Sequence, residues 1–259
     1  MNILDRIAEA TRERVRQERA RCSLESLKEL ARVRTDGLFQ RAIEKPGLSL
    51  ICEVKKASPS RGIIDPEFNY RAIAADYAAG GADAISCLTE PEWFLGSDQI
   101  FREIRALVPT PMLRKDFVVD AYQIWQASVM GADAVLLICA LLDAGTLAHY
   151  LDLCHGLGLS ALVETHDTAE IAMAVSAGAK IIGVNNRNLR DFTVDLGNAA
   201  RLRDCIPTEC LYVSESGVRS PEDAAAMKEA GADAILVGEA LMRAGDRQAM
   251  IEALRDGHG

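Results

Sequence analysis

A short motif recurs in this sequence about every 50 residues, and it constrains the fold more than any other feature. The string Gly-Ala-Asp-Ala begins at Gly81, Gly131 and Gly231, and a variant, GAKIIGV, begins at Gly178. In each copy a stretch with helical spacing ends at the glycine, and a short run of apolar residues follows. Glycine is the usual residue just past a helix, because it adopts the left-handed backbone conformation without steric cost. The repeat therefore indicates one helix-to-strand unit that is used several times.

Eight apolar runs of strand length lie in and between the copies of this repeat. They fall near residues 48–54, 83–88, 111–115, 133–138, 159–164, 180–184, 211–214 and 233–238. Amphipathic helical stretches separate them, among them 70–79, 122–130, 168–177 and 221–230. Strands that are apolar on both faces are typical of a parallel sheet covered by helices. Eight such units in 259 residues predict an α/β fold, a closed (β/α)8 TIM barrel, rather than an open sheet.

Residues 1–46 lie outside the repeat and have a composition typical of charged, amphipathic helices. Their apolar residues recur at helical spacing, at Ile3, Leu4 and Ile7 and again at Leu24, Leu27 and Leu30. We therefore expect an N-terminal helical extension, 1–46, followed by a (β/α)8 barrel catalytic domain, 47–259, in a single domain overall. The apolar face of the extension must be covered by something. Two compatible interpretations are packing on the barrel and a lid over one of its mouths.

The charge balance and the N-terminus narrow the partners and the location of the protein. A formal net charge of −9 argues against nucleic acid and against anionic membranes as partners. A few local cations can still bind a small anionic substrate. The first 20 residues are charged throughout and lack the apolar core of a secretory signal. No apolar run approaches the ~18 residues that a membrane span needs, so we expect a soluble, cytoplasmic protein.

The cysteines and histidines provide no pattern of disulfide pairing or metal binding. The seven cysteines, an odd number without a CxxC pair, are Cys22, Cys52, Cys87, Cys139, Cys154, Cys205 and Cys210. Most lie in apolar runs, as buried free thiols in a reducing compartment do. The histidines at 149, 155, 166 and 258 lack the spacing of metal ligands, so no metal is predicted. His166 follows the fifth strand, where a capping or turn role is the simplest interpretation.

Polar and charged side chains follow five of the predicted strands at their carboxyl ends, where barrels of this kind have their active sites. They are Glu53 and Lys55 after the first strand, Lys115 after the third, Glu164 after the fifth, Asn185 and Arg187 after the sixth, and Glu215 after the seventh. Glu53 and Lys55 are two residues apart, so both side chains point to the same side. Each residue alone fits an ordinary solvated strand end. Five strands that agree indicate one common site.

Two lysines and at least two glutamates at one mouth can supply proton donors and proton acceptors. Burial and neighbouring charges are expected to bring the pKa of a lysine down, and that of a glutamate up, towards neutrality. We therefore predict an acid–base site rather than a metal site. No nucleophile elbow and no Ser-His-Asp arrangement can be recognised. No G-x-G-x-x-G follows the first strand, which disfavours a dinucleotide site.

The last two strands carry a second signal, a glycine at each strand end directly before a helical stretch. The strings are SESG and VGEAL, with Ser216 and Gly217 in the first and Gly238 and Glu239 in the second. TIM barrels frequently bind phosphate at this place through backbone N–H groups. Arg187 and Lys55 could add cationic contacts. The alternative is that these glycines only allow tight turns.

Several segments resemble those of one enzyme family. LICEVKKASPSRGII is similar to the signature segment of indole-3-glycerol-phosphate synthases, and this string is long and specific. CLTEPEWFLGS, LRKDFVVDAYQI, ALVETHD, IIGVNNRNL, VSESGV and ILVGEALM are similar to the family's segments at corresponding barrel positions. The resemblance covers essentially the whole chain, the N-terminal extension included. Thr165 and Cys139 depart from the family's pattern, at positions without a functional role.

The resemblance implies a reaction in tryptophan biosynthesis. The substrate is 1-(2-carboxyphenylamino)-1-deoxyribulose 5-phosphate, and ring closure, decarboxylation and dehydration give indole-3-glycerol phosphate, carbon dioxide and water. No metal or organic cofactor is implied. The enzyme would be a carbon–carbon lyase that acts on a phosphorylated small molecule.

The resemblance also implies roles for individual residues. Lys115 resembles the general acid that protonates the ketone, and Glu164 resembles the acid–base partner in dehydration. Lys55 would pair with the substrate carboxylate and also donate a proton later, although the order of transfers between the two lysines stays open. The supporting catalytic residues are Glu53, Asn185 and Glu215. The substrate-binding residues are Ser58, Phe94, Phe117, Leu136, Arg187, Ser216, Gly217, Gly238 and Glu239, of which Phe94, Phe117 and Leu136 would enclose the aromatic ring.

Two rival functions can be separated from this one. A phosphoribosylanthranilate isomerase on the same barrel would need a Cys or Asp base at the end of the first strand, where this chain has Glu53 and Lys55. A catalytically silent barrel that only binds a phosphorylated ligand would not need a competent residue at every acid–base position. We expect a monomer without a fused partner enzyme. Contact with other enzymes of tryptophan biosynthesis is left open.

Overall fold

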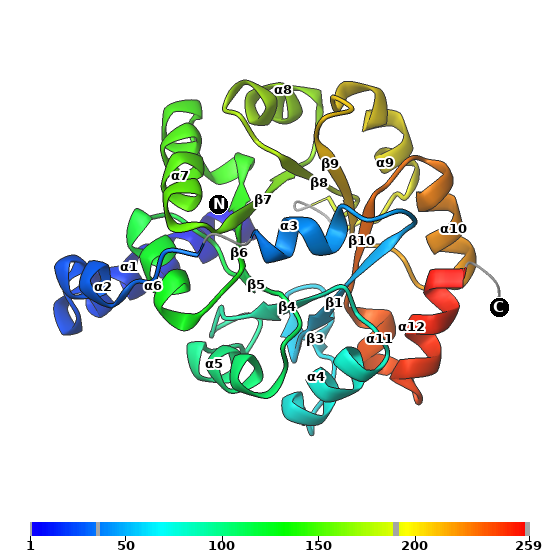
Figure 1. Cartoon of the computed structure of the whole chain (residues 1–259), viewed down its shortest axis with the longest axis horizontal. Coiled ribbons are helices and arrows are strands. Elements are labelled where there is room, and N and C mark those ends of the chain that lie inside the picture. Colours follow the sequence, from blue (N-terminus) through cyan, green and yellow to red (C-terminus); the bar gives the residue numbers. More distant parts are fainter. Residues whose placement is uncertain (1, 35–36, 189–191, 257–259) are drawn as a thin grey trace.

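The computed structural model describes residues 2–34, 37–188 and 192–256, and eight parallel strands in it form a closed barrel (Figure 1). The strands are β1 (Ser49–Val54), β4 (Ala84–Leu88), β5 (Met112–Lys115), β6 (Ala134–Ile138), β7 (Ser160–Thr165), β8 (Ile181–Asn185), β9 (Leu211–Glu215) and β10 (Ala234–Val237). They follow one another around the barrel in chain order, and β10 closes on β1. The predicted TIM barrel is confirmed, and every predicted strand is present within one or two residues of its expected ends.

Helices surround the barrel in the intervals between the strands. They are α4 (Tyr70–Ala79), α5 (Asp98–Leu107), α6 (Ala121–Met130), α7 (Ala144–Leu157), α8 (Thr168–Ser176), α9 (Gly197–Leu202), α10 (Pro221–Glu229), α11 (Glu239–Arg243) and α12 (Arg247–Asp256). Two 3-10 turns, η1 (Cys139–Leu141) and η2 (Arg203–Cys205), and a small hairpin of β2 (Ala57–Ser58) and β3 (Gly62–Ile63) complete the loops. Asp120, Asp143 and Asp167 each accept a backbone N–H at a helix start, which fixes where α6, α7 and α8 begin.

The aspartate of the repeated motif joins neighbouring strands at the amino-terminal end of the barrel. The carboxylate of Asp133 accepts the backbone N–H of Met112 at 2.8 Å, and the N–H of Asp133 donates to the carbonyl of Met112 at 2.9 Å. Asp83 makes the same reciprocal pair with Leu50, and Asp233 makes it with Tyr212. The repeat therefore places one carboxylate at three strand junctions, where it satisfies a backbone donor that the sheet leaves free.

Replacing Asp133 with alanine is expected to lower the free energy of unfolding by about 3 kcal/mol, since a buried N–H and the guanidinium of Arg105 lose their common acceptor. Urea unfolding followed by circular dichroism would measure this. Lys180 occupies the same position in the variant copy and is exposed, so Lys180→Ala is the matched control, with an effect below about 0.5 kcal/mol. A loss below 1 kcal/mol for Asp133→Ala would contradict the proposed role of the repeat.

Alternate residues of each strand pack into two separate apolar clusters. Side chains that point into the barrel include Ile51, Leu113 and Leu162, and those that point outward pack against the surrounding helices. Side chains alternate along a strand, so residues two positions apart point the same way. Glu53, Lys115 and Glu164 each follow one of these inward residues by two positions and therefore also point into the barrel. The fold therefore brings the strand-end charges together on the barrel axis.

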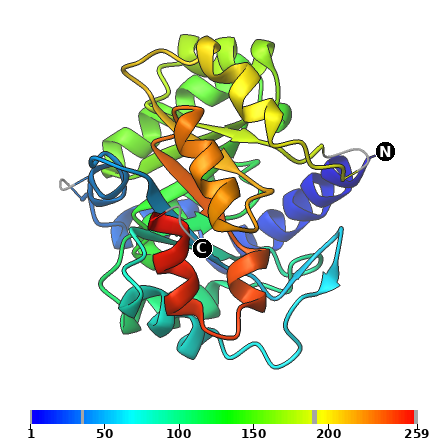
Figure 2. The same cartoon turned by 90° about the vertical axis from the view of Figure 1, so that its right-hand side faces the viewer.

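The N-terminal extension closes the barrel at both ends (Figures 1 and 2). It forms α1 (Ile3–Arg21), α2 (Leu24–Leu30) and α3 (Leu38–Ile43). Helix α3 lies across the amino-terminal end, where Phe39 and Ile43 are fully buried in the interior cluster. Helix α1 lies at the opposite end, as Figure 2 shows. Leu4, Ile7 and Leu27 are buried as expected, but Leu30, the last residue of α2, is 61 % exposed.

The cysteines are free thiols, and five of the seven are buried. Cys205, in η2, is exposed instead of buried, because its turn lies on the surface between α9 and β9. Within the described ranges, none of the helices is long and apolar enough to cross a membrane.

Candidate active site

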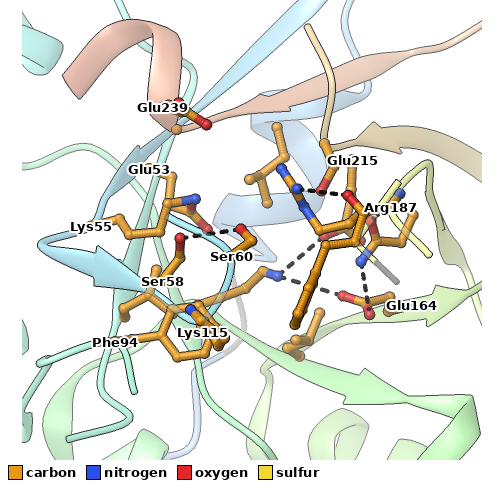
Figure 3. A pocket seen from close by; sticks show the side chains of 18 of the residues that line it. Glu53, Lys55, Ser58, Ser60, Phe94, Lys115, Glu164, Arg187, Glu215 and Glu239 are labelled. Carbon is orange, nitrogen blue, oxygen red and sulfur yellow. Dashed lines mark hydrogen bonds and ion pairs between the residues drawn. The ribbon is translucent and has the colours of Figure 1, made fainter. Parts of the chain in front are cut away.

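One pocket at the carboxyl ends of the strands contains every residue predicted to take part in the site (Figure 3). These residues are Glu53, Lys55, Ser58, Phe94, Lys115, Phe117, Leu136, Glu164, Asn185, Arg187, Glu215, Ser216, Gly217, Gly238 and Glu239. Helix α1 adds a wall to the pocket, as the lid interpretation of the extension expects, and the loops that carry Ser60, Ile64 and Arg219 add walls that sequence reasoning missed. The alternation of strand side chains was sufficient to find the charged residues. It gives no information about segments that reach the pocket from elsewhere in the chain.

Lys115, the last residue of β5, lies between two buried carboxylates. Its Nζ is 3.3 Å from an oxygen of Glu215 and 3.5 Å from an oxygen of Glu164 (Figure 3). Burial disfavours the charged ammonium, but the carboxylates of Glu215, Glu164 and Glu53 outweigh this effect and raise the pKa of Lys115. The expectation of a lowered lysine pKa is therefore wrong for this residue. Lys115 is held as a charged donor whose proton can move only to a group that becomes strongly basic.

Glu215, at the end of β9, behaves as was expected of a buried acid. Burial, with the nearby carboxylates of Glu164 and Glu53, raises its pKa to about 7 in spite of the attraction of Lys115. One of its oxygens approaches Gly183 of β8, where an added Cβ would lie 2.2 Å from Oε1. Glycine is needed at this position because the carboxylate occupies the space of a side chain. Glu215 can therefore hold or release a proton near neutral pH.

Glu53 and Lys55 form an ion pair beside β10, the last strand of the barrel. Both side chains point to the same side of β1, as their spacing predicts, and Lys55 donates to the carboxylate of Glu53. Burial opposes ionisation of Glu53, but the charges of Lys55 and Lys115 outweigh it and lower the pKa of this carboxyl. An added Cβ at Gly238 would lie 2.3 Å from Oε2 of Glu53. Gly238 therefore makes room for the Glu53–Lys55 pair, in addition to any contact with a ligand.

Glu164 and Asn185 face each other from neighbouring strands. The side-chain amide of Asn185 donates to Oε1 of Glu164 at 3.1 Å, and Asn185 also accepts the backbone N–H of Arg187. The ring of His166 lies on another side of the same carboxylate, with its Nε2 3.4 Å from Oε1. Sequence reasoning assigned His166 only a turn role. Its position two residues after Glu164 was the available signal, because such residues share one side of a strand.

One end of the pocket is apolar. The rings of Phe94 and Phe117 lie with their centroids 5.9 Å apart at an interplanar angle of 40°, and Leu136 contributes from β6. Helix α1 adds Ile3, Leu4 and Ile7 to this end. Tilted aromatic side chains and aliphatic groups of this kind bind planar apolar ligands.

The other end of the pocket is cationic and lies at β8, β9 and β10. Burial, together with the charges of Arg61 and Arg219, lowers the pKa of Arg187 although the carboxylate of Glu239 opposes this, so three guanidinium groups gather here around one carboxylate. Ser216 and Gly217 both have left-handed backbone conformations, with φ of +66° and +102°. An added Cβ at Gly217 would lie 2.7 Å from the side chain of Val194. A bound anion would relieve the repulsion between the guanidinium groups.

A buried network behind Lys115 connects the site to α1. Both oxygens of Asp116 accept Nη2 of Arg14 at 2.8 Å, and Thr89 donates its hydroxyl to the same carboxylate at 2.8 Å. Arg114, 2 % exposed, adds a second cation. The pKa of Asp116 is lowered because these guanidinium groups outweigh the effect of its burial. Asp116 also accepts the N–H of Phe117, so the network holds the backbone of this aromatic residue as well.

Buried acids and bases that face one another across a pocket at the carboxyl ends of barrel strands are typical of enzymes. Such a pocket requires no metal for proton transfer. Among the described residues, no three His, Cys, Asp or Glu side chains are grouped so that they could hold a metal ion. The prediction that no cofactor is needed remains a prediction. By fold and by the place of its pocket, the chain is a TIM-barrel enzyme.

Comparison with known proteins gives the particular family. Residues 4–254 match the family model of indole-3-glycerol phosphate synthase. An indole-3-glycerol phosphate synthase of Ruminiclostridium cellulolyticum is 50 % identical over 256 residues, which cover 98 % of each chain. That of Endomicrobium trichonymphae is 46 % identical over 257 residues, 98 % of this chain and 100 % of the relative. The chain belongs to the indole-3-glycerol phosphate synthase family, which are carboxy-lyases of tryptophan biosynthesis, and the resemblance inferred from the sequence is confirmed.

Solved structures with low sequence identity share the fold. A 3-hexulose-6-phosphate synthase from Salmonella typhimurium has a TM-score of 0.66 at 13 % identity and covers 81 % of this chain and 98 % of its own. A thiamine phosphate pyrophosphorylase from Pyrococcus furiosus has a TM-score of 0.60 at 20 % identity, covering 81 % of this chain and 95 % of its own. These likenesses support the barrel architecture and nothing about the substrate.

Proposed function

We propose that this pocket converts 1-(2-carboxyphenylamino)-1-deoxyribulose 5-phosphate to indole-3-glycerol phosphate, carbon dioxide and water, with the residues assigned below. The observation that supports this assignment best is the placement of Lys115 between Glu164 and Glu215. The reaction needs a donor for a ketone oxygen and an acceptor for protons lost during dehydration. The three side chains offer one charged donor and two carboxylates within one pocket.

The first chemical step is formation of a carbon–carbon bond between the aromatic ring and the ketone carbon. The electron pair of the carbonyl moves to its oxygen, which takes the proton of Lys115. Because the pKa of Lys115 is raised, this transfer becomes favourable only as the oxygen gains alkoxide character, so the ammonium acts where charge develops. Loss of carbon dioxide then returns the electrons of the broken bond to the ring.

The second step is loss of water, which forms the remaining double bond of the indole. The hydroxyl made from the ketone takes a proton from an acid and leaves as water. The neighbouring carbon gives up a proton to a base, so one proton is supplied and one is removed. Glu164 acts as the acid–base group in this step, held by the amide of Asn185. Glu215 has a pKa near neutrality and can exchange a proton with Lys115 between turnovers, which restores the ammonium.

The two ends of the pocket fit the two ends of this substrate. The aromatic ring lies among Phe94, Phe117 and Leu136, and its carboxylate pairs with Lys55. The phosphate lies at the cationic end, near Arg187 and the backbone of Ser216 and Gly217. Ser58, Gly238 and Glu239 complete this end, and Glu53 orients Lys55. Desolvation at the apolar end would aid decarboxylation, because it weakens hydration of the carboxylate.

Helix α1 acts as a lid over the aromatic end in this proposal. Three of its apolar residues face the pocket, and Arg14 anchors the helix to Asp116 beside Lys115. The Asn2 and Asp5 side chains cap the start of the helix, so its first turn is ordered where it meets the pocket. Helix closure of this kind excludes water from a reacting centre.

Deleting residues 2–21 removes α1 and leaves α3 in place. We expect KM to rise about tenfold or more, because the aromatic end loses its apolar cover, while the barrel stays folded. Steady-state kinetics and a thermal melt followed by circular dichroism would measure both effects. In the full-length chain, the double variant Ile3→Ala, Leu4→Ala tests the same contact, and the exposed Arg12→Ala on the same helix is the control. Unchanged kinetics in the folded truncated protein would limit the extension to packing.

The proposed function is tested most directly by following indole formation from the anilino-ribulose phosphate by absorbance or fluorescence. The expected result is turnover without added metal, and the absence of turnover in a folded protein would contradict it. We further propose that the enzyme acts as a cytoplasmic monomer. Sedimentation velocity would test the oligomeric state.

A further inference from the structure

His166 lies directly behind the carboxylate of Glu164. It follows β7, and its imidazole reaches two carboxylates at once. The Nε2 is 3.4 Å from Oε1 of Glu164, and the Nδ1 is 3.0 Å from Oε2 of Glu170 at the start of α8. The Nε2 is buried and has no hydrogen-bond partner, and the carboxylate that it approaches lines the pocket.

A turn role alone does not explain this ring. The backbone N–H of His166 donates to Glu170 at 2.8 Å, and this bond closes the turn before α8. Any residue except proline could supply that N–H. The imidazole therefore contributes something that the turn does not need. A neutral imidazole that donates from Nδ1 to Glu170 would have an unprotonated Nε2, which is an acceptor. This acceptor would face the carboxylate of Glu164, which is also an acceptor, and such a contact is unfavourable when both groups are buried.

The charges around His166 favour the imidazolium form. Glu164 faces it from β7, Glu170 from α8 and Glu215 from β9, and burial is the opposing effect. The three carboxylates outweigh burial and raise the pKa of His166. The ring also borders a polar hollow whose other charged residues are Asp5, Asp167, Glu170, Arg187, Asp195 and Arg201. As an imidazolium, His166 donates one N–H to Glu170 and turns the other towards Glu164 at ion-pair distance, so that neither ring nitrogen is an acceptor facing a carboxylate.

We propose that His166 is a positioning residue that holds the carboxylate of Glu164 in place, as a charged partner on the side away from Lys115. The proposal rests on the acid–base role proposed for Glu164. The carboxylate then has three fixed neighbours, because Asn185 and His166 face Oε1 and Lys115 faces Oε2. His166 does not touch the substrate. It acts through the orientation and charge of the carboxylate that does.

The test compares His166→Gln with the natural enzyme across pH 6 to 9. At the acidic end kcat of the variant should be about tenfold lower, the scale of one lost charge-assisted hydrogen bond, and KM should stay within about twofold. His155→Gln, an exposed histidine on α7, is the matched control and should not change kcat. The turn is kept in the variant, because glutamine retains the backbone N–H.

The pH dependence of the effect separates a charged partner from a merely structural one. In the ratio of kcat between the natural enzyme and His166→Gln, the effects of ionisations that both proteins share, such as that of Glu215, cancel. Because the folded pKa of His166 is raised, the imidazolium is complete at low pH and is lost as pH rises through that pKa. The ratio should therefore fall towards one at alkaline pH. Glu170→Gln should move this fall to lower pH, since it removes one of the stabilising carboxylates.

Imidazole nitrogen NMR on the folded enzyme provides a second measurement that does not depend on activity. The His166 signals, assigned by their loss in His166→Gln, should titrate above the ordinary histidine range, and Glu164→Gln should lower that pKa. An ordinary or lowered pKa, or a kcat ratio that is constant with pH, would overturn the proposal. If His166→Gln is fully active while Glu164→Gln is inactive, the inference fails and the proposed function stands. If Glu164→Gln is itself fully active, the role of Glu164 fails first.

Discussion

Replacing Lys115 with methionine is expected to lower kcat by at least ~10²-fold, the scale of a lost general acid. Methionine keeps most of the length of the side chain and removes the ammonium. The nearest other ammonium in the pocket, that of Lys55, is paired with Glu53, so it is not free to replace the lost donor. Steady-state kinetics with the anilino-ribulose phosphate would measure the change. A folded variant that loses less than tenfold in kcat would contradict the role of Lys115.

The fold of this variant should survive at neutral and acidic pH. Without the ammonium, Glu164 and Glu215 can share a proton, because the pKa of Glu215 is already about 7. A carboxyl whose pKa is raised in the folded state favours folding below its unfolded pKa, and this contribution is lost as pH rises. The variant should therefore unfold more easily than the natural enzyme as pH increases from about 5 to 9. A matched control is Lys180→Met at an exposed strand start.

Replacing Glu164 with glutamine is expected to lower kcat by about 10²-fold or more and to leave KM within about threefold. Glutamine keeps the shape and can still accept the amide of Asn185, but it cannot transfer a proton. If Glu164 acts in dehydration, the earlier loss of carbon dioxide should be affected less. Single-turnover measurements of carbon dioxide release and of indole fluorescence would separate the two steps.

The two variants should therefore differ in the step at which they stop. Lys115→Met should delay carbon dioxide and indole equally, because carbon–carbon bond formation precedes both. Glu164→Gln should release carbon dioxide well before indole appears. Equal delays in Glu164→Gln would show that this residue acts before decarboxylation, and the assignment of the two roles would have to be exchanged. Glu252→Gln is a useful control, since this exposed residue lies outside the pocket on α12.

The barrel and its charged site could be predicted because both depend on local periodicity. The four copies of the glycine motif and the apolar runs in and between them gave the eight strands within one or two residues. Alternation along the strands then identified the inward position at each strand end, and Glu53, Lys115 and Glu164 all occupy it. Physical rules of this kind apply to neighbouring residues, and in a repeated fold they apply many times.

Features that depend on contacts between distant segments could not be predicted in the same way. The reciprocal bonds of Asp133 require the neighbouring strand, and the pair of Arg14 and Asp116 joins residues 102 positions apart. The pKa of Lys115 was expected to fall through burial. It rises because three carboxylates from three other strands surround it, and how close they come to its ammonium became known only when the strands were assembled.

The position of α3 has a consequence for how the chain must fold during synthesis. Phe39 and Ile43 dock into a cluster that includes Ala234 and Leu236 on the last strand. On the ribosome, roughly 190 further residues must emerge before that docking surface is complete. The segment therefore exposes two large apolar side chains through most of translation, a state that is prone to aggregation and attracts chaperones. Since the first-made helices can close the barrel only after its last strand is in place, their docking is a late event in the biogenesis of this enzyme.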